Sequence, residues 1–290
     1  MYEQLLESID CPLCGSRDSS AWAMENGFSA VKCSSCGLVF VNPRPNKLEI
    51  SAANKIGVHR TEGGALEVSY RRHPRRVERY RKLIAEIFAD EISSGRVLRW
   101  LDVGAGYGEF IEAATLALPN GSTICGIDPM EPKVRAAQAR GLDVSTRSLS
   151  DVTGPFDVIS LINVFSHVPD FRQFCSELKG KLAPNGVLFI QTGNGGDLKR
   201  RADYPDELCL PDHLVFAGRE HIERYLNLAG FELTTVKNRR VDGIIGSVQT
   251  TLNNLRRGVF AFRFPYASPF RTVFYKAILR AGADGDVRAP

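Results

Sequence analysis

The sequence predicts an α/β protein built on a parallel sheet and preceded by a small metal-binding module. Two observations carry this prediction. From about residue 97 to residue 236, short apolar runs alternate with stretches of helical periodicity, a pattern typical of a parallel sheet covered by helices on both faces. Near the start, two C-x₂-C-G sequences stand close together, at Cys11–Gly15 and Cys33–Gly37, and this spacing is typical of zinc-binding knuckles.

The composition is that of a globular protein. A chain of 290 residues with 43% hydrophobic residues is long enough to bury a core and to carry an appendage. A net charge of +4 is too small to indicate a nucleic acid partner by itself. No apolar run is long enough to span a membrane, and the acidic first residues lack the apolar core of a secretory signal. We therefore expect a cytoplasmic protein.

The cysteine module is predicted to span residues 1–45 and to hold a structural zinc ion. Its ligands are Cys11, Cys14, Cys33 and Cys36. Four thiolates complete a tetrahedral site, so no position stays open for catalysis. A segment so short and so poor in apolar residues needs the ion to fold. The alternative is a pair of redox-active C-x₂-C motifs, which is disfavoured because neither motif lies in a βαβ context. The module ends at two prolines, in the sequence Val-Asn-Pro-Arg-Pro.

Two segments then lead into the main domain. Residues 46–69 have a mixed composition with three glycines, and they are interpreted as a linker or as a lid over the cofactor mouth. From residue 70 to residue 90, apolar residues recur with helical spacing, which predicts the leading helix of a domain over residues 70–245. Basic residues on the other faces of this helix indicate either a solvated surface or a contact with phosphate.

The strongest local signal is a strand that runs directly into three alternating glycines, Gly104, Gly106 and Gly108. Glycines at such a turn let the backbone bend sharply and approach a ligand, and the helix that follows offers free N–H groups. A second strand then ends at Asp128, a carboxylate suited to both hydroxyls of a ribose. The dinucleotide fingerprint needs a third glycine where this chain has Glu109, so the pattern disfavours a pyrophosphate ligand.

With these motifs the chain resembles the class I S-adenosylmethionine-dependent methyltransferases over roughly residues 96–233. The first motif of that family reads much like Leu101–Gly108, and its second strand also ends in an acidic residue. Three later segments fit in order as fourth strand, post-strand segment and fifth strand, at Phe156–Asn163, Val164–Asp170 and Leu182–Ile190. The resemblance implies a Rossmann-like sheet of seven strands and S-adenosylmethionine as cofactor.

Carried over residue by residue, the resemblance assigns the cofactor contacts to the glycine turn and to the ends of the following strands. These residues are Asp102, Gly104, Ala105, Gly106, Tyr107, Gly108, Asp128, Pro129, Ser148, Leu149 and Asn163. Ser148 and Leu149 stand where the family often has an acidic residue near the adenine amino group. A hydroxyl or a backbone carbonyl is expected to serve there instead, with Asp151 as a rival.

Two histidines are candidate catalytic bases. A hydroxyl or carbon acid must lose a proton when it is methylated, and histidine can accept one near pH 7. His167 follows the fourth strand and matches a histidine of the family's post-strand segment. His213 lies in the polar loop after the fifth strand, the expected substrate wall, and it resembles a histidine that many small-molecule members carry. His213 is the favoured base, with Asp212 or Asp170 orienting whichever imidazole acts, and a structural role is the alternative for both histidines.

The acceptor is inferred from resemblance alone. A ribbon that begins CPLCG, closes with Val-Asn-Pro-Arg-Pro and is joined to a Pro-Asp-His-Leu loop is similar to bacterial methyltransferases that tailor sugars and polysaccharides. It implies a sugar hydroxyl or a sugar carbon, on a nucleotide-sugar or a glycan. The alternative is an rRNA base methyltransferase, although that group has a histidine among its ribbon ligands and an Asn-Pro-Pro-Tyr type motif that this chain lacks. An alternative of another class is a non-catalytic S-adenosylmethionine-binding scaffold.

The last segment, residues 246–290, is predicted to be a C-terminal extension of the methyltransferase domain. Basic and aromatic residues are interleaved in it, and no acidic residue occurs before Asp284. Three roles fit this composition: a cap on the substrate pocket, a peripheral contact with a membrane, or packing on the domain. A nucleic acid partner is not expected.

Overall fold

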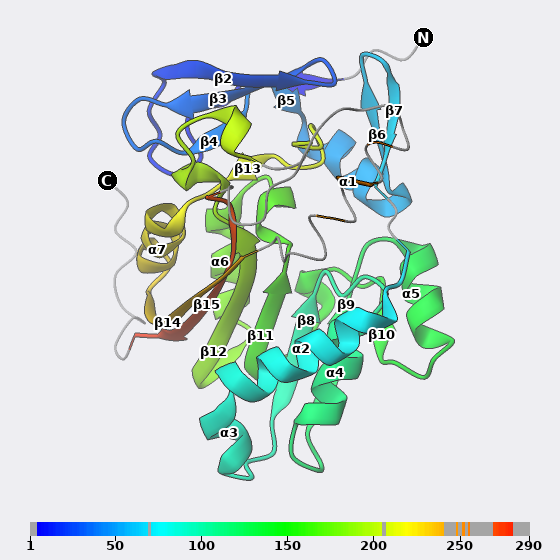
Figure 1. The fold of residues 1–290 in the computed structure, drawn as a ribbon. Coiled ribbons are helices and arrows are strands. Elements are labelled where there is room, and N and C mark those ends of the chain that lie inside the picture. Colours follow the sequence, from blue (N-terminus) through cyan, green and yellow to red (C-terminus); the bar gives the residue numbers. More distant parts are fainter. Residues whose placement is uncertain are drawn as a thin grey trace.

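The computed structural model describes residues 5–68, 71–204, 207–240, 248, 251–252, 255 and 269–280. A sheet of seven strands forms its centre (Figure 1). The strands are β8 (Arg99–Val103), β9 (Thr123–Ile127), β10 (Val144–Ser145), β11 (Phe156–Ile162), β12 (Leu182–Gly193), β14 (Phe231–Arg240) and β15 (Arg271–Leu279). They lie in the order β10-β9-β8-β11-β12-β15-β14, and the first five run parallel. This arrangement confirms the predicted Rossmann-like α/β sheet of seven strands.

Helices cover both faces of this sheet, because successive side chains of a strand point to opposite sides. The helices are α2 (Pro74–Ile87), α3 (Ala89–Ser93), α4 (Glu109–Ala117), α5 (Glu131–Gln138), α6 (Phe171–Lys179) and α7 (Arg219–Leu228). On one face, α2 and α4 pack against Trp100 and Phe189 of the sheet. On the other face, α6 and α7 pack against Leu101 and Leu188. Two helices, α2 and the short α3, stand where the periodicity predicts one.

The strand β15 corrects the predicted end of the methyltransferase domain. It lies between β12 and β14 and is antiparallel to both, so a part of the expected C-terminal extension completes the central sheet. Its buried side chains, among them Phe274 and Tyr275, supply the apolar surface that a covered strand needs. Lys276 contributes to the basic character from which the sequence predicts an extension. In the structure its ammonium group is paired with Glu91 at 2.6 Å.

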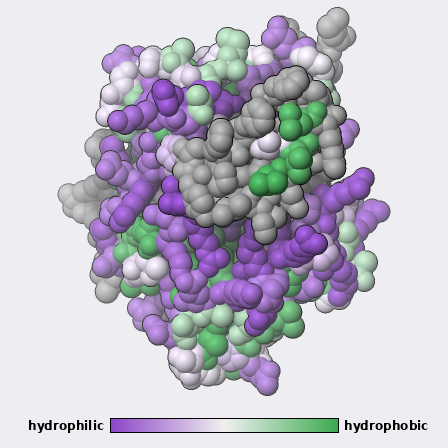
Figure 2. Space-filling view, in the orientation of Figure 1, coloured by the Kyte–Doolittle hydropathy of each residue, from purple (hydrophilic) through white to green (hydrophobic). Residues whose placement is uncertain are grey.

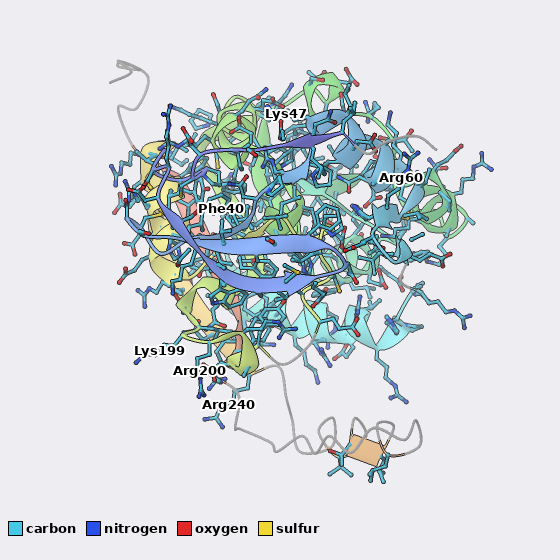
Figure 3. The ribbon with its side chains drawn as sticks, turned by 90° about the horizontal axis from the view of Figure 1, so that it is seen from above. Phe40, Lys47, Arg60, Lys199, Arg200 and Arg240 are labelled. Carbon is cyan, nitrogen blue, oxygen red and sulfur yellow. The ribbon has the colours of Figure 1, made fainter. Side chains whose placement is uncertain are left out.

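The cysteine module forms a second sheet at one end of the first (Figures 1 and 3). Its strands are β2 (Ser19–Glu25), β3 (Phe28–Cys33), β4 (Val39–Val41) and β13 (Val215–Phe216), in the order β13-β4-β3-β2. Beside it, β1 (Leu6–Glu7) pairs with β5 (Arg44–Pro45). The strand β13 comes from the loop between residues 193 and 218, for which the sequence predicts no secondary structure. The pairing is long-range, so the module and this loop, the expected substrate wall, share one sheet.

The predicted linker or lid over residues 46–69 has its own secondary structure. It contains α1 (Lys47–Ile56) and a hairpin of β6 (Val58–Thr61) and β7 (Gly64–Glu67). The side chain of Asn46 caps α1 by accepting hydrogen bonds from the backbone N–H groups of Leu48 and Glu49. Gly57 ends the helix with φ of +70°. Cap residues thus set the bounds of α1 in this segment, which is called the insert below. The mixed composition of the segment does not predict this helix.

Outside the grey atoms, the face of the molecule in Figure 2 is largely hydrophilic, with scattered apolar patches. Among the described residues, no helix combines the length and the apolar character that crossing a bilayer requires. Most of the predicted extension between residues 246 and 268 lies outside the described residues. A cap on the pocket and a peripheral membrane contact by that extension therefore stay predictions.

Candidate active site

A cavity of about 690 Å³ lies at the carboxyl ends of the parallel strands. One side is formed by the segments that follow β8, β9 and β11 and by the end of β12, and another by the segment that leads into β13. The insert contributes Asn54 and Val68. Ligands of open α/β sheets bind at this end of the strands, and the volume is in the range of small-molecule sites. This cavity is the candidate active site.

The glycine turn after β8 presents bare backbone to the cavity. Gly104 has φ of +74°, and a Cβ atom there would lie 2.3 Å from a methyl group of Val164, so only glycine fits. Gly106 has φ of +56°, and a Cβ atom there would meet nothing within 4 Å. Because Gly106 lines the cavity, its backbone faces open space. A ligand can therefore approach this turn closely.

Asp128, directly after β9, is held in place by two backbone groups. Its Oδ2 accepts a hydrogen bond of 2.8 Å from the N–H of Gly106, and its Oδ1 accepts one of 2.9 Å from the N–H of Met130. Each carboxylate oxygen has a second acceptor position, and Asp128 lines the cavity. The oriented carboxylate of Asp128 fits the ribose hydroxyls of S-adenosylmethionine. The open glycine turn beside it lets the cofactor approach the protein backbone.

Asp102 is a second carboxylate at the cavity, and it is buried at 1% exposure. Burial raises its pKa to about 7, although the Ser160 hydroxyl, which donates to Oδ1 at 2.5 Å, opposes this rise. Trp100 in turn donates its indole N–H to the Ser160 oxygen at 2.9 Å. This buried chain of hydrogen bonds fixes the carboxyl group at the base of the glycine turn.

The structure places most of the predicted cofactor residues around this one cavity. The cavity lining includes Asp102, Gly104, Ala105, Gly106, Tyr107, Asp128, Pro129 and Asn163. Three predicted residues, Gly108, Ser148 and Leu149, are not part of the cavity lining, so their contact with the cofactor stays a prediction. Gly108 packs where a Cβ atom would lie 2.5 Å from Leu142, Ser148 donates its hydroxyl hydrogen to Asp151, and Leu149 is buried in the core.

The two candidate histidines lie close together in the lining of the cavity. Nδ1 of His167 lies 3.0 Å from the backbone oxygen of Asp212 and 3.2 Å from its Oδ1. Nδ1 of His213 lies 2.8 Å from the backbone oxygen of Leu208. The two rings are 4.8 Å apart between centroids. Asp170, the other predicted orienting residue, instead caps α6 by accepting from the N–H of Gln173.

The surroundings shift the pKa values of the two imidazoles in opposite directions. Burial alone would lower the pKa of His167, but the hydrogen bond and the negative charge of Asp212 raise it overall above its ordinary value. Burial, reinforced by His167, lowers the pKa of His213 to about 4. The pKa of the Asp212 carboxyl is lowered despite its burial, because His167 and His59 lie beside it. His213 is thus neutral near pH 7, whereas His167 is the stronger base.

The cysteine module holds the loop that carries these groups. Glu25, at the end of β2, accepts hydrogen bonds from the backbone N–H groups of Leu208 and Cys209, at 2.8 and 2.6 Å. The backbone N–H of Leu214 donates to the oxygen of Ser166 at 2.7 Å, beside His167. The loop is therefore fixed between the module and the segment after β11.

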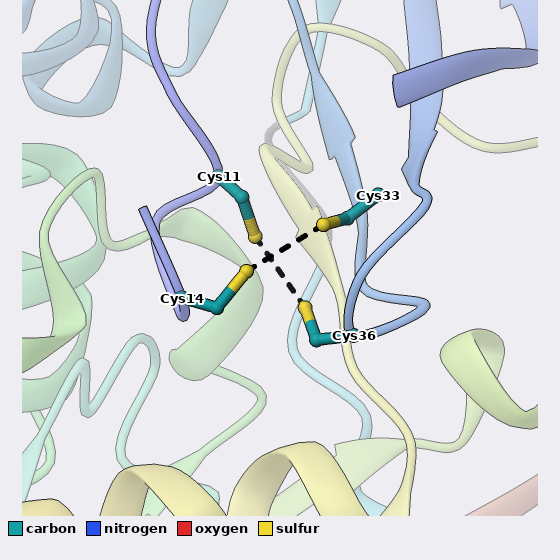
Figure 4. A group of neighbouring side chains, drawn as sticks. All are labelled: Cys11, Cys14, Cys33 and Cys36. Atoms are coloured by element: carbon teal, nitrogen blue, oxygen red, sulfur yellow. Dashed lines mark hydrogen bonds between the residues drawn. The ribbon is translucent and has the colours of Figure 1, made fainter. Parts of the chain in front are cut away.

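Within the module, the four cysteine side chains converge (Figure 4). The sulfur atoms of Cys11 and Cys36 are 3.5 Å apart, and those of Cys14 and Cys33 are 3.6 Å apart. All four sulfur atoms lie within 4.8 Å of one another. A tetrahedral zinc site with Zn–S bonds of about 2.3 Å requires sulfur atoms about 3.8 Å apart. The donor set and its spacing fit that ion.

Comparison with known proteins identifies the family. A family profile described as "Methyltransferase domain" matches residues 70–236, more than half of the chain. The chain belongs to this family of methyltransferase domains. A solved structure of the plantazolicin methyltransferase BamL, in complex with a triazolic desmethylPZN analog and SAH, has 14% sequence identity and a TM-score of 0.50, covering 70% of this chain and 85% of that one. It agrees with the fold of the methyltransferase domain.

Curated relatives match the same domain over part of its length. The ubiquinone biosynthesis O-methyltransferase of Actinobacillus pleuropneumoniae serotype 5b (strain L20) is 35% identical over 108 residues, which cover 32% of this chain and 45% of that protein. The enzyme of the same name from Rhodopseudomonas palustris (strain HaA2) is 26% identical over 166 residues, covering 53% of this chain and 64% of that protein. The chain thus spans less than two thirds of the length of these relatives.

Replacing Asp128 by alanine should weaken binding of S-adenosylmethionine by about tenfold to a hundredfold. The reason is the loss of a charged acceptor that the N–H groups of Gly106 and Met130 hold toward the cavity. Titration calorimetry measures this affinity directly. Asp143→Ala, at an exposed carboxylate beyond α5, is the control and should bind as wild type. Wild-type affinity in Asp128→Ala would remove this residue from the cofactor site.

Proposed function

We propose that the protein transfers the methyl group of S-adenosylmethionine to a hydroxyl of a small-molecule acceptor, with His167 as the general base. The observation that carries this proposal is the His167–Asp212 pair at the wall of the cavity. A base oriented by a carboxylate is the arrangement expected where a proton must be removed. The pair also argues for catalysis over the scaffold alternative, since binding of the cofactor alone needs no such base.

The residues of the chain divide the chemistry between them. When bound, S-adenosylmethionine supplies an electrophilic methyl group. The protein then has to hold the acceptor oxygen in line and take its proton. With Nδ1 donating to Asp212, the neutral imidazole of His167 has its lone pair on Nε2, where it can accept that proton. His213, with Nδ1 donating to Leu208, stays neutral and offers a second Nε2 to the acceptor.

This assignment moves the favoured base from His213 to His167. A base acts best when its pKa lies near the working pH, and a pKa of about 4 makes His213 a weak proton acceptor. Its place in the substrate loop supports a hydrogen-bonding role toward the acceptor instead.

The acceptor side of the cavity is rich in aromatic rings. Tyr204 lies 4.7 Å from Phe270 and 5.8 Å from Phe216 between ring centroids, and all three line the cavity. Such walls suit a flat apolar body with one hydroxyl. The relatives named for ubiquinone biosynthesis favour a phenolic ring for that body. A sugar hydroxyl or sugar carbon, on a nucleotide-sugar or glycan, remains the second proposal from the sequence, because the face of a sugar ring can also lie on aromatic side chains.

We also propose that the four cysteines bind one structural zinc ion. Their sulfur spacing and the absence of an open ligand position support this role. The backbone supports it too: Gly15 donates to the oxygen of Cys11 and Gly37 to that of Cys33, both with positive φ, which forms two matching knuckles.

The pH dependence of turnover tests the base. As the pH falls, His167 becomes protonated through a pKa above its ordinary value of about 6.5, so the rate should fall in that range. The measurement is transfer of labelled methyl from S-adenosylmethionine to a panel of phenols and nucleotide-sugars, followed with pH for any acceptor that reacts. A rate that persists down to about pH 4 would give the role to His213 instead.

A further inference from the structure

His59, in the insert between the cysteine module and the methyltransferase domain, reaches the candidate active site. It lies on β6, opposite Leu66 of β7, and its side chain is 3% exposed. Its Nε2 lies 3.0 Å from Oδ1 of Asp212, the same oxygen that lies 3.2 Å from Nδ1 of His167. Asp212 is itself buried at 7% exposure. One buried carboxylate oxygen therefore stands between two imidazoles from distant parts of the chain.

Among the described residues, Asp212 is the only polar contact of the His59 side chain. Its Nε2 is buried and forms no aligned hydrogen bond with any of them. A buried polar atom without a partner is costly, and a small rotation of the ring or of the carboxylate would align Nε2 with Asp212. Because it is 3.0 Å away, this carboxylate is the natural acceptor for the N–H of His59.

We propose that His59 is a positioning residue that donates its Nε2–H to Asp212 and so sets how strongly Asp212 acts on His167. This inference rests on the proposed function, since it concerns the same imidazole. The donated hydrogen bond shares the carboxylate charge between two donors. The insert, which reads as a linker or lid in the sequence, thereby becomes part of the active site.

The sign of the effect follows from the burial of Asp212. If His59 is lost, the carboxylate cannot turn to solvent, and His167 is left as its remaining side-chain donor. The carboxylate then attracts the proton of His167 more strongly, so the pKa of His167 should rise. The other titratable groups that act on this pair are His213 beside Asp212 and Lys133 of α5, with Glu25 of β2 acting on His213. Substituting His59 leaves them unchanged.

Three variants distinguish the loss of the hydrogen-bond donor of His59 from the loss of the packing of its ring. His59→Phe keeps a ring but has no donor, His59→Asn has an amide that falls short of Asp212, and His59→Gln carries an N–H near the position of Nε2. The protonation of His167 is followed by NMR of the imidazole nitrogens in the full chain without added ligand. Turnover against pH, the melting temperature and the affinity for S-adenosylmethionine are measured in parallel.

The pKa of His167 should rise in His59→Phe and His59→Asn and stay near wild type in His59→Gln. The rate at pH 6 should fall about tenfold in the first two variants, as for a lost hydrogen bond to a charged group, and recover at higher pH. Cofactor affinity should not change. If His59→Phe does not fold, His59→Asn carries the test.

An unchanged or lowered pKa of His167 in the donor-free variants, or equal losses in all three, would overturn the positioning role. The NMR result does not depend on catalysis. Full turnover in His167→Ala would overturn the proposed function alone, so the two failures are distinguishable.

Discussion

Replacing His167 by alanine should lower turnover by roughly 10²–10⁴, the usual contribution of a general base. The imidazole is oriented by Asp212 through contacts of 3.0 and 3.2 Å, and alanine has no group that can accept a proton. Binding of S-adenosylmethionine should change little, because the glycine turn and Asp128 follow other strands, β8 and β9. Steady-state kinetics with labelled methyl and calorimetry with the cofactor measure the two effects separately.

The matched control is His73→Ala. His73 is exposed, and its contact with Glu109 is made by the backbone N–H, so the variant should turn over as wild type. His213→Ala is the informative comparison and should cost less than His167→Ala. The reverse order would transfer the base to His213. Full turnover in both variants would mean that no base is needed, and an amine or carboxylate acceptor would replace the hydroxyl.

Replacing Cys33 by serine should remove the zinc ion and with it both stability and turnover. Binding of zinc contributes roughly 10 kcal/mol or more to the folding of small zinc modules. In this chain the module also forms β4, which pairs with β13, and carries Glu25, which holds the backbone of Leu208 and Cys209. Loss of the ion should therefore release the loop that carries Asp212 as well as lower the melting temperature.

Metal analysis should find about one zinc ion per wild-type chain and less in Cys33→Ser. Cys125→Ser is the control, because Cys125 lies on β9 away from the cysteine cluster and should keep both metal and turnover. A wild-type protein that is folded, active and free of metal would refute the zinc proposal. Full turnover in a metal-free Cys33→Ser protein would show that the loop holds its place without the module.

Several parts of the site could be predicted from sequence because their signals are local. Gly104 and Gly106 adopt conformations that favour glycine, and the turn that they form involves only residues close together in the sequence. The cysteine pairs Cys11–Cys14 and Cys33–Cys36 are recognised from the spacing of three residues within each pair. Strands and helices of the central sheet follow from apolar periodicity along a single segment. These features need no knowledge of what lies opposite them.

Tertiary structure alone decided the remaining parts. The insertion of β15 between β12 and β14 and the pairing of β13 with β4 depend on which sheet edges meet. His59 reads as an ordinary residue of a mixed segment, and only the fold brings it within 3.0 Å of Asp212. Ser148 lies in the expected region, yet its hydroxyl turns to Asp151. The physical reason is common to all of them: periodicity specifies which side of an element is buried, whereas the partner on that side is selected by long-range packing.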